Sequence, residues 1–439
     1  MINNLTEGKP LKLLFFFAVP MVVGNLFQQL YNMVDSMVVG RFVGEDALAA
    51  VGSSFPVVFL SVAVAAGLSM GCTVVISQFF GAGKIREMKV TVSTALISLG
   101  VIGLIIMGIG ELTSFPLLKL LGTDPDIMTD SLAYLRIYFG GAVFLFLYNS
   151  LNGIYNALGD SQTPLKFLMV SALTNIVLDL LFVIKFNMGV AGVAWATLIS
   201  QGMCAVFSFF VLIARLRKME NEEEARGKAF TFFDMSSAER IAKVGVPSML
   251  QQSIVSVGML LVQSVVNRFG SAALAGYSAA SRIESVCVVP MIATGNAVAT
   301  FTAQNIGAGQ TDRVRQGYRA SYGILAVFAA VIAVVLTVFN RSVIAAFLGG
   351  EPSPEAMETG TGYLSYIAFF LILLGAKASS DGVLRGCGDM LVFTLANLIN
   401  LAIRVTAAFA LAPVIGVSAV WCVVPLGWLV NFLISFLRY

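Results

Sequence analysis

Long apolar segments fill almost the whole chain and are separated by short stretches with charges, Gly or Pro. A run of about twenty apolar residues is a transmembrane helix candidate, because a helix of that length crosses the hydrocarbon core of a bilayer. With 439 residues, 58% hydrophobic and 12% charged, the chain is too apolar for a soluble globular protein. We therefore predict an all-α integral membrane protein without room for a soluble catalytic domain.

The pattern of apolar runs predicts about twelve membrane-spanning helices. Residues 1–10 lack the charged region and cleavage site of a signal peptide, so we expect the first span to serve as its own insertion signal. The predicted spans cover residues 11–40, 47–80, 88–111, 127–158, 164–186, 190–215, 238–269, 273–303, 313–340, 357–385, 390–411 and 417–437.

The distribution of basic residues predicts the orientation, because cytoplasmic loops of membrane proteins carry an excess of Lys and Arg. One set of span ends collects such residues, including Lys84, Arg86 and Lys89, whereas the opposite ends hold acids such as Asp124 and Asp126. We therefore expect a multi-pass protein of the cell membrane with both termini in the cytoplasm.

One long polar stretch, residues 215–234, interrupts the apolar pattern near the middle of the chain. Its composition is typical of a solvated connector. It holds Glu220, Glu222, Glu223 and Glu224 among basic residues. We therefore predict an N-terminal six-helix lobe at 1–216, a cytoplasmic linker at 217–236 and a C-terminal six-helix lobe at 237–439.

The two halves carry matching motifs in the same order, which indicates an internal repeat. AVP at 18–20 recurs as GVP at 245–247, QFFGAG at 78–83 as QNIGAG at 304–309, and GIYNALGD at 153–160 as GVLRGCGD at 382–389. Because each half has an even number of spans, the repeats share one orientation, as in a two-lobed, pseudo-symmetric transporter. The Gly-Ala-Gly motifs are expected to end helices through left-handed glycines.

Asn175 and Asp179 lie inside an apolar run, where an ionisable side chain is costly and indicates function. Their spacing places them on one face of a helix. Asp35 and Thr197, on other spans, fall at a similar depth, about 9 to 12 Å from the outer boundary at 1.5 Å per residue. The pattern predicts a pocket of oxygen ligands for Na⁺ or H⁺. The alternative is that Asp179 only hydrogen-bonds to a neighbouring helix.

Several kinds of chemistry are not expected. Histidine is absent and the five cysteines are scattered without a Cys-x-x-Cys motif. Zinc, haem and histidine-based catalysis are therefore not predicted, and the coupling ion is the only cofactor we expect. The formal charge of +3 is small and spread over span ends, which argues against a nucleic-acid partner.

The second half has its own intramembrane charges. Lys377 and Asp381 are four residues apart and are expected to pair on one helix, while Glu284 is expected to pair with Arg404 or Lys377. Polar, Met and aromatic side chains either line a cavity for hydrophobic substrates or simply pack. The cavity candidates are Gln28, Met33, Tyr138, Tyr148, Tyr155, Gln251, Gln252, Glu284 and Asp381.

These residues and motifs resemble the multidrug and toxic compound extrusion (MATE) family over essentially the whole chain. Asp35, Asn175, Asp179 and Thr197 look like the cation site of the N-terminal lobe in the DinF-like branch of that family. The resemblance implies that these positions bind H⁺ or Na⁺ and drive export of organic cations. Another branch has an acidic residue on the seventh span, but residues 249–257 contain no acidic residue and have Gln251 and Gln252 instead, which argues against a second cation site.

The expected function is cation-coupled antiport of small, hydrophobic and cationic compounds by alternating access, in a monomeric, lipid-embedded protein that is not an enzyme. Two alternatives stay open. A flippase for a lipid-linked precursor would need a cationic cavity, for which Arg282, Lys377 and Arg404 are the candidates. An intramembrane enzyme would use Asp35 and Asp179 as an aspartyl pair.

Overall fold

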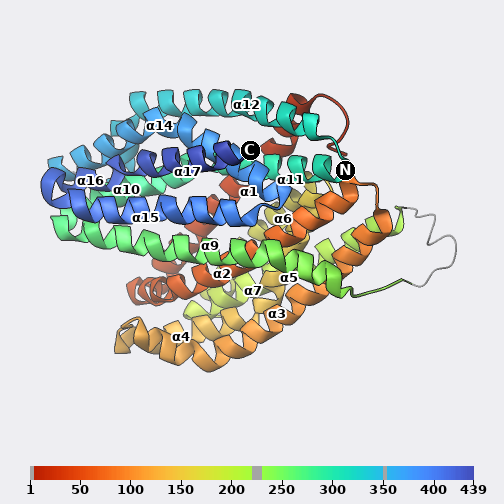
Figure 1. Ribbon diagram of the computed structural model, residues 1–439. Coiled ribbons are helices and arrows are strands. Elements are labelled where there is room, and N and C mark those ends of the chain that lie inside the picture. The colour runs from red at the N-terminus through yellow and green to blue at the C-terminus, as the bar shows by residue number, and fades with distance from the viewer. Residues whose placement is uncertain (1–3, 220–229, 350–352) are drawn as a thin grey trace. The chain divides into compact units, whose positions relative to one another are not determined.

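The structure, a computed structural model, describes residues 4–219, 230–349 and 353–439, except for the side chains at 257, 259 and 260. All regular elements in these residues are helices (Figure 1). Nine helical segments of the described chain are long and apolar enough to cross a membrane, and a bent pair of helices makes up to ten. The predicted all-α membrane fold is confirmed, whereas the number of twelve spans stays a prediction.

The chain forms two compact units whose bounds cut through two helices. Unit 1 extends from Val23 to Leu250, and unit 2 combines Leu5–Val22 with Gln251–Tyr439. Helix α1 (Pro10–Val38) therefore begins in unit 2 and continues in unit 1. Helix α9 (Met235–Val266) begins in unit 1 and continues in unit 2.

The remaining elements belong to one unit each. Unit 1 contains α2 (Glu45–Gly81), α3 (Ile85–Leu120), α4 (Pro125–Gly140), α5 (Ala142–Ala157), α6 (Gln162–Leu180), α7 (Gly189–Arg217) and two π-helical turns, η1 (Val39–Val43) and η2 (Leu181–Lys185). Unit 2 contains α10 (Gly270–Cys287), α11 (Val289–Gly307), α12 (Thr311–Val338), α13 (Asn340–Leu348), α14 (Pro354–Cys387), α15 (Met390–Ile415), α16 (Ala419–Cys422), α17 (Val424–Arg438) and two 3₁₀ turns, η3 (Asn267–Phe269) and η4 (Gly416–Ser418).

Some predicted features fall on residues that the structure does not describe. The predicted linker at 217–236 includes residues 220–229, which lie outside the described part of the chain. The same holds for the acidic residues expected there, Glu220, Glu222, Glu223 and Glu224. The lobe boundaries at 216 and 237 therefore stay predictions.

The predicted span at 127–158 is two helices in the structure, α4 and α5, which meet at an angle of 50°. Gly141 separates them. A Cβ atom at this position would lie 2.9 Å from Cγ of Leu198 on α7, so the Leu198 side chain would have to move to accommodate any other residue.

The core of unit 1 is built where α5 packs against α2 and α3. Gly153 of α5 faces α2, and a Cβ atom there would lie 2.5 Å from Oγ of Ser69. The Ser69 hydroxyl donates a hydrogen bond to the main-chain oxygen of Asn149 at 2.6 Å. Small side chains at this contact allow the two backbones to approach closely, as is usual between membrane helices.

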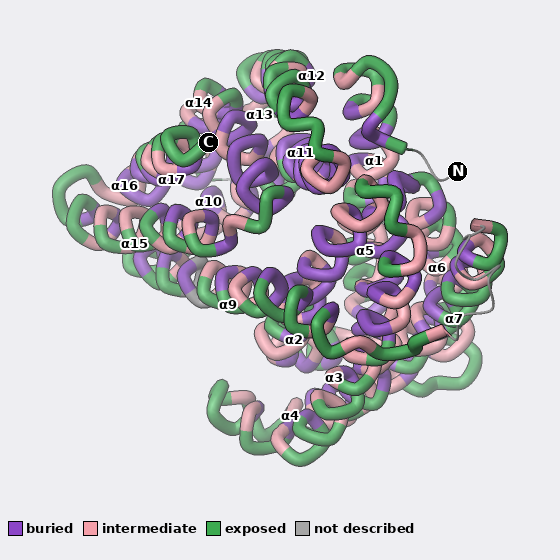
Figure 2. Tube along the Cα trace, turned by 45° about the vertical axis from the view of Figure 1, so that its right-hand side comes forward, coloured by how far each residue is buried: buried purple, intermediate pink, exposed green. Residues whose placement is uncertain are grey.

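The core of unit 2 repeats this contact between α11 and α14. Helix α11 is buried along almost its whole length (Figure 2). Gly382 of α14 faces Gly295 of α11, where a Cβ atom would overlap the Gly295 carbonyl oxygen. Gly153 and Gly382 are the first residues of one repeated motif, so the repeat found in the sequence marks an equivalent close helix contact in each unit.

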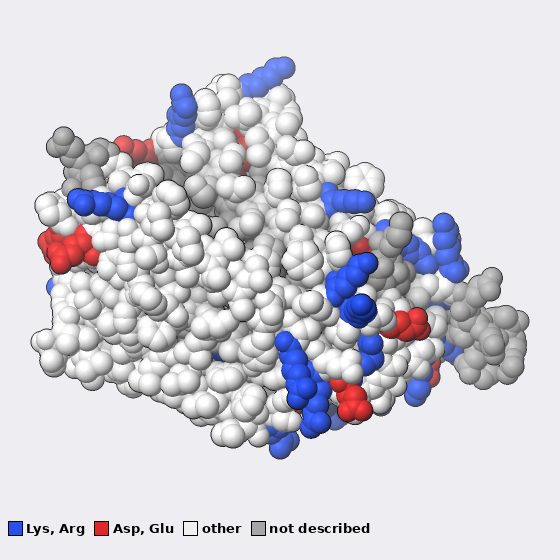
Figure 3. Space-filling model, turned by 90° about the horizontal axis from the view of Figure 1, so that it is seen from above, with Lys and Arg blue, Asp and Glu red and all other residues white. Residues whose placement is uncertain are grey.

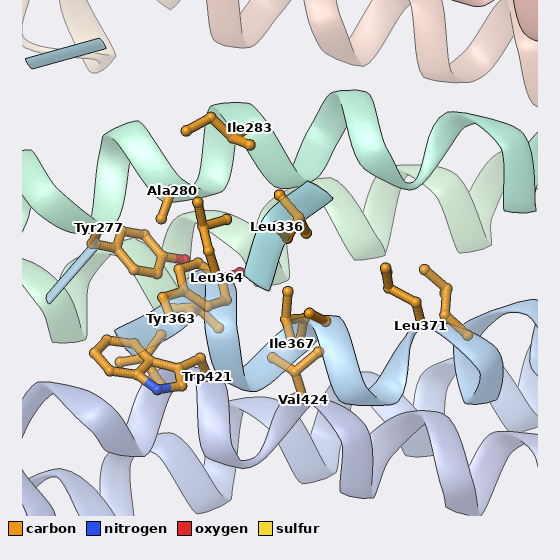
Figure 4. Packing of buried hydrophobic residues seen from close by; sticks show 14 of the residues in the cluster. Tyr277, Ala280, Ile283, Leu336, Tyr363, Leu364, Ile367, Leu371, Trp421 and Val424 are labelled. Atoms are coloured by element: carbon orange, nitrogen blue, oxygen red, sulfur yellow. The ribbon is translucent and has the colours of Figure 1, made fainter. Parts of the chain in front are cut away.

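Aromatic side chains form a second part of the unit 2 core, where α10, α14 and α16 meet (Figure 4). Tyr363 of α14 lies between Tyr277 of α10 and Trp421 of α16, with ring centroids 5.6 Å and 5.4 Å away and nearly parallel planes. The Tyr363 hydroxyl donates to the carboxylate of Glu284. The stack of three rings therefore joins α14 to α10 on one side and to α16 on the other.

The predicted helix ends at the Gly-Ala-Gly motifs are confirmed. Gly83 has φ +69° and Gly309 has φ +70°, the left-handed conformation that glycine adopts without strain. The following amides close the helices, with Lys84 N donating to Phe79 O at 3.0 Å and Gln310 N donating to Asn305 O at 2.8 Å. The same sequence signal therefore ends α2 and α11.

The segment before α1 is fastened to unit 2 by main-chain hydrogen bonds. Leu5 is buried, and its amide donates to Oε1 of Gln304 at 2.9 Å. Arg313 donates to the carbonyl oxygens of Gly8 at 3.0 Å and Leu5 at 3.3 Å. Leu14, Phe17 and Ala18 then pack against Phe301 in one apolar cluster. The start of α1 is thus an integral part of the unit 2 core.

The surface suits a bilayer. Large hydrophobic side chains are widely exposed; Leu112 and Leu120 of α3, for example, are each 83% accessible. On the face shown in Figure 3, uncharged side chains cover most of the centre and charged ones lie toward the rim. Extensive exposed apolar surface of this kind is stable only in contact with lipid or detergent.

Candidate functional site

The centre of the candidate site is α6, which presents Asn175 and Asp179 on one face as predicted. Both side chains are buried, with 1% and 0% accessibility. When the Asn175 amide is oriented to satisfy both its atoms, Nδ2 donates to Oδ2 of Asp179 at 2.9 Å and Oδ1 accepts from Thr197 N at 3.2 Å. The amide therefore joins the Asp179 carboxyl to α7.

Helix α1 brings Asp35 to the same place. The carboxyls of Asp35 and Asp179 lie within hydrogen-bonding reach of each other. Oδ1 of each carboxyl is buried and makes no hydrogen bond to the residues that the structure describes. Two of the four carboxyl oxygens are therefore available for a proton or a small cation, which is the fit that a cation site requires.

Two tyrosines complete the surroundings, and the sequence analysis missed both. Tyr31, one turn before Asp35 on α1, lies beside Thr197 and close to both carboxyls. Tyr134 of α4 also lies close to both carboxyls. The spacing of four between Tyr31 and Asp35 would have placed Tyr31 on the same helix face, whereas Tyr134 comes from a helix for which the sequence offered no such spacing.

A π-helical turn follows each carboxylate. Asp35 is followed by η1 at Val39–Val43, and Asp179 by η2 at Leu181–Lys185. Such turns are rare and occur often at functional sites, because they rotate the side chains before them relative to those after them. Both carboxylates thus lie next to local departures from regular helix.

The space beside the site is small. A cavity of about 10 Å³ is lined by Tyr134, Tyr138, Thr197 and Gln201, among others. A volume of this order holds about one water molecule. It suits the hydration of a proton or small ion and is far too small for an organic substrate.

The chemistry of the site follows from its charges. Two carboxylates in contact repel each other strongly in a membrane interior, and a proton or small cation removes that repulsion. Carboxylate, amide and hydroxyl oxygens are the ligands that hard cations prefer. No salt bridge to Asp35 or Asp179 occurs among the described residues.

Three other acids between or inside the helices have a basic partner in their own unit. Asp160 pairs with Arg215, Asp381 with Lys377, and Asp389 with Arg438. Glu284 forms no salt bridge among the described residues but accepts a hydrogen bond from Tyr363. The Asp35–Asp179 pair differs from all four because two carboxyls lie together without a basic side chain among the described residues.

The predicted cavity residues of unit 1 occupy different environments. Gln28 is half-buried and Met33 is 40% accessible on α1. Tyr138 and Tyr148 are half-buried on α4 and α5. Tyr155 is completely buried and its hydroxyl donates to Ser208 O at 2.8 Å, so it packs inside the unit 1 core.

The predicted cavity residues of unit 2 are mostly tied to neighbours. Gln251 is buried and Gln252 half-buried on α9. Glu284 accepts a hydrogen bond from Tyr363. The expected Lys377–Asp381 pair is confirmed, with Nζ and Oδ2 2.8 Å apart. The role of these residues in substrate binding stays a prediction.

The fold is that of a multi-pass helical membrane protein. The MatE family model matches residues 20–181 and 247–410. The chain is 31% identical over 403 residues to the probable multidrug resistance protein YpnP of Bacillus subtilis, covering 90% of this chain and 87% of that protein. It is 24% identical over 405 residues to the probable multidrug resistance protein NorM of Thermotoga maritima, covering 91% and 85%.

Solved structures give the same result for the fold. An outward-facing multidrug resistance MATE transporter of the MOP superfamily superposes with a TM-score of 0.90 at 24% identity, covering 99% of this chain and 96% of the other. The chain therefore belongs to the MatE family of multidrug efflux transporters. Its relatives are transporters and not enzymes, in agreement with the prediction from sequence.

Proposed function

We propose that this protein is a cation-coupled antiporter that exports hydrophobic, cationic organic compounds by alternating access, with H⁺ or Na⁺ as the coupling ion. The ion binds between Asp35 and Asp179, and Asn175 and Thr197 complete its surroundings. The protein acts in the cell membrane as a monomer, with lipid around its exposed helices and both termini in the cytoplasm.

The observation that supports the proposal is the contact between the Asp35 and Asp179 carboxyls, each with one buried oxygen that lacks a described partner. An acidic pair without a basic neighbour has a strong affinity for positive charge in a membrane interior. Binding and release of that charge is the simplest way for such a pair to change state during transport.

Coupling requires that the ion and the substrate prefer different states of the protein. In the outward-facing state the pair takes up the ion from outside, which weakens the hold on the cationic substrate. In the inward-facing state the ion leaves and the negative charge favours a new cationic substrate. The relatives named as multidrug resistance proteins support small organic compounds as the substrate class.

The experiment is efflux of a fluorescent organic cation from proteoliposomes under a pH gradient and a Na⁺ gradient, imposed separately. It compares the wild type with Asp179→Asn and Asp35→Asn. Asp130→Asn is the matched control, because it is the same chemical change at an exposed position of unit 1. We expect one gradient to drive transport in the wild type and the control, and neither gradient to drive it in the two site variants.

Full efflux in both folded site variants would contradict the proposal. Transport that no gradient drives in folded wild type would favour the flippase alternative, with Arg282 and Arg404 as the next positions to test. The intramembrane enzyme would require a specific cleavage product that disappears in the same variants.

A further inference from the structure

Unit 2 contains a second buried acid, and its positive partner is part of the chain. The Lys377 ammonium lies 2.8 Å from Oδ2 of Asp381 and 3.0 Å from Oδ1 of Asn397. Asn397 also donates from Nδ2 to Oδ2 of Asp381 at 3.2 Å, and the Ser435 hydroxyl donates to Oδ1 of Asp381 at 3.1 Å. The ammonium is therefore held by oxygens of two helices, α14 and α15, while α17 fixes the carboxylate.

Two further amides extend this cluster. Asn400, one turn after Asn397 on α15, is buried, and its Oδ1 makes no hydrogen bond to the described residues. Asn431, one turn before Ser435 on α17, is completely buried, and neither of its amide atoms has a partner in the described chain. Oδ1 of Asn400 lies against Gly427 of α17, because a Cβ atom at Gly427 would be only 2.2 Å from it. Buried polar atoms are normally satisfied, so these unused amide atoms, one turn from residues of the cluster, are unusual.

The other charged groups near the cluster are held by different partners. Arg385, one turn after Asp381, donates to Oδ1 of Asn296 at 3.0 Å and lies over the Phe393 ring. It also donates to the main-chain oxygen of Asp381 at 3.4 Å and acts electrostatically on the Asp381 carboxylate. Glu284 accepts from Tyr363. Arg404 follows Asn400 by one turn on α15 and acts electrostatically on Glu284. The ammonium that contacts the Asp381 carboxylate is that of Lys377.

We propose that Lys377 is a built-in cation that occupies an oxygen-lined site in unit 2, and that removing its ammonium opens this site to a small alkali cation such as Na⁺. The ligands of the opened site are the Asp381 carboxylate and the Asn397 amide oxygen, the two groups that hold the Lys377 ammonium. In the wild-type chain the site does not exchange ions, because its cation is covalently attached.

The comparison with unit 1 supports this reading. There the acidic pair has one amide and one hydroxyl beside it and no basic partner in the described residues. In unit 2 a carboxylate and an amide are again adjacent, but a lysine one turn away supplies the charge. One consequence rests on the proposed function: if the protein is a cation-coupled antiporter, its transport cycle exchanges cations in unit 1 and not in unit 2. The proposal about Lys377 itself does not depend on antiport.

The test measures ion binding and not transport, so its result does not depend on the antiport proposal. All variants carry Asp179→Asn, which removes the unit 1 carboxylate pair. Full-length purified protein with Lys377→Met is compared with Lys377→Arg, which retains the charge, and with the double change Lys377→Met and Asp381→Asn, which removes both charges. Binding of radioactive ²²Na⁺ is measured at constant ionic strength with choline as the replacement cation, together with the unfolding temperature as Na⁺ rises.

We expect saturable Na⁺ binding that approaches a single ion per chain for Lys377→Met, and binding at the background level for the other two. The unfolding temperature of Lys377→Met should rise with Na⁺, whereas those of the two comparison variants should not. Folded Lys377→Met that binds no more Na⁺ than Lys377→Arg would overturn the proposal.

A failure of Lys377→Met to fold is also informative. If it folds only when purified in Na⁺, the ion replaces the ammonium and the proposal is supported. If it fails to fold with or without Na⁺ while the double variant folds, Na⁺ does not satisfy the Asp381 carboxylate and the proposal is wrong.

Discussion

The Asp160 carboxylate forms an ion pair with the Arg215 guanidinium, which fastens the junction of α5 and α6 to the end of α7. Asp160 also accepts hydrogen bonds from the amide of Thr163 at 3.1 Å and from its hydroxyl at 2.7 Å. The equivalent residue of the second repeat, Asp389, accepts from Val392 N at 3.4 Å and pairs with Arg438 at 2.7 Å. Each repeat thus uses its Gly-Asp ending to begin one helix and to hold the last helix of that repeat, α7 or α17.

Asp160→Asn is expected to lower the stability of the protein by about 2 kcal/mol, because hydrogen bonds to a buried charged group are lost. The carboxylate and guanidinium side chains are 0% and 30% accessible in the Asp160–Arg215 pair, but 24% and 61% accessible in the Asp389–Arg438 pair. Asp389→Asn should therefore cost less than about 1 kcal/mol, the usual value for an exposed pair. Measuring the unfolding midpoints of both variants and the wild type in detergent tests this difference. Equal losses of stability in Asp160→Asn and Asp389→Asn would contradict the prediction.

The contribution of Asp160 should depend on pH. Asp160 lies between two spans, and burial acts to raise its pKa, but hydrogen bonds from Thr163 and Arg215 outweigh burial and hold the pKa below its usual value. A carboxyl whose pKa is lowered by folding stabilises the protein above its unfolded pKa, about 3.9, and loses this effect as the pH falls through the folded pKa. The difference in unfolding temperature between wild type and Asp160→Asn should be full at pH 7 and shrink below about pH 4. A difference that stays constant down to pH 3 would argue against this role of the carboxylate.

Gly382→Ala should destabilise unit 2 by about 1 to 3 kcal/mol, the usual cost of overpacking. The new methyl group would overlap the Gly295 carbonyl oxygen and lie 3.2 Å from Cβ of Val298, so α11 and α14 would have to separate. Gly362→Ala is the matched control on the same helix, because nothing lies within 4 Å of a Cβ atom there. It should be neutral or slightly stabilising, since alanine favours helix. Similar unfolding temperatures for both variants would show that the close contact is not important.

Removal of a tyrosine hydroxyl should have different effects at two positions of unit 1. Tyr155→Phe should cost about 1 kcal/mol, because the hydroxyl donates to Ser208 O at 2.8 Å in a buried place. Tyr138→Phe should change stability little, because the buried Tyr138 hydroxyl makes no hydrogen bond to the described residues. Thermal unfolding of both purified variants would test this. A larger loss of stability for Tyr138→Phe than for Tyr155→Phe would contradict the prediction that the Tyr155 hydroxyl is the one that stabilises the fold.

Much of the fold follows from patterns that act over short distances. Hydrophobic run lengths predict the helices, and the repeat predicts that Gly153 and Gly382 are equivalent. The i, i+4 spacing places Asn175 beside Asp179 and Lys377 beside Asp381, and the structure shows both contacts. These relationships lie within one helix or one motif, so the sequence contains all the information that they need.

The features that the sequence does not predict depend on neighbours distant in the chain. The π-helical turns after Asp35 and Asp179 last five residues each, too few for a period to be distinguished from that of an α-helix. The bend at Gly141 depends on the approach of Leu198 from α7. Tyr134 reaches the carboxylates because α4 packs against α7, which no local pattern indicates.

The division of α1 and α9 between the units makes the two repeats dependent on each other for folding. Each repeat begins with a helix whose first part belongs to the other unit, and Leu14 and Phe17 pack against Phe301 there. A fragment that ends between the repeats would therefore lack part of its own core. We expect the two halves of this chain to fold only when both are present.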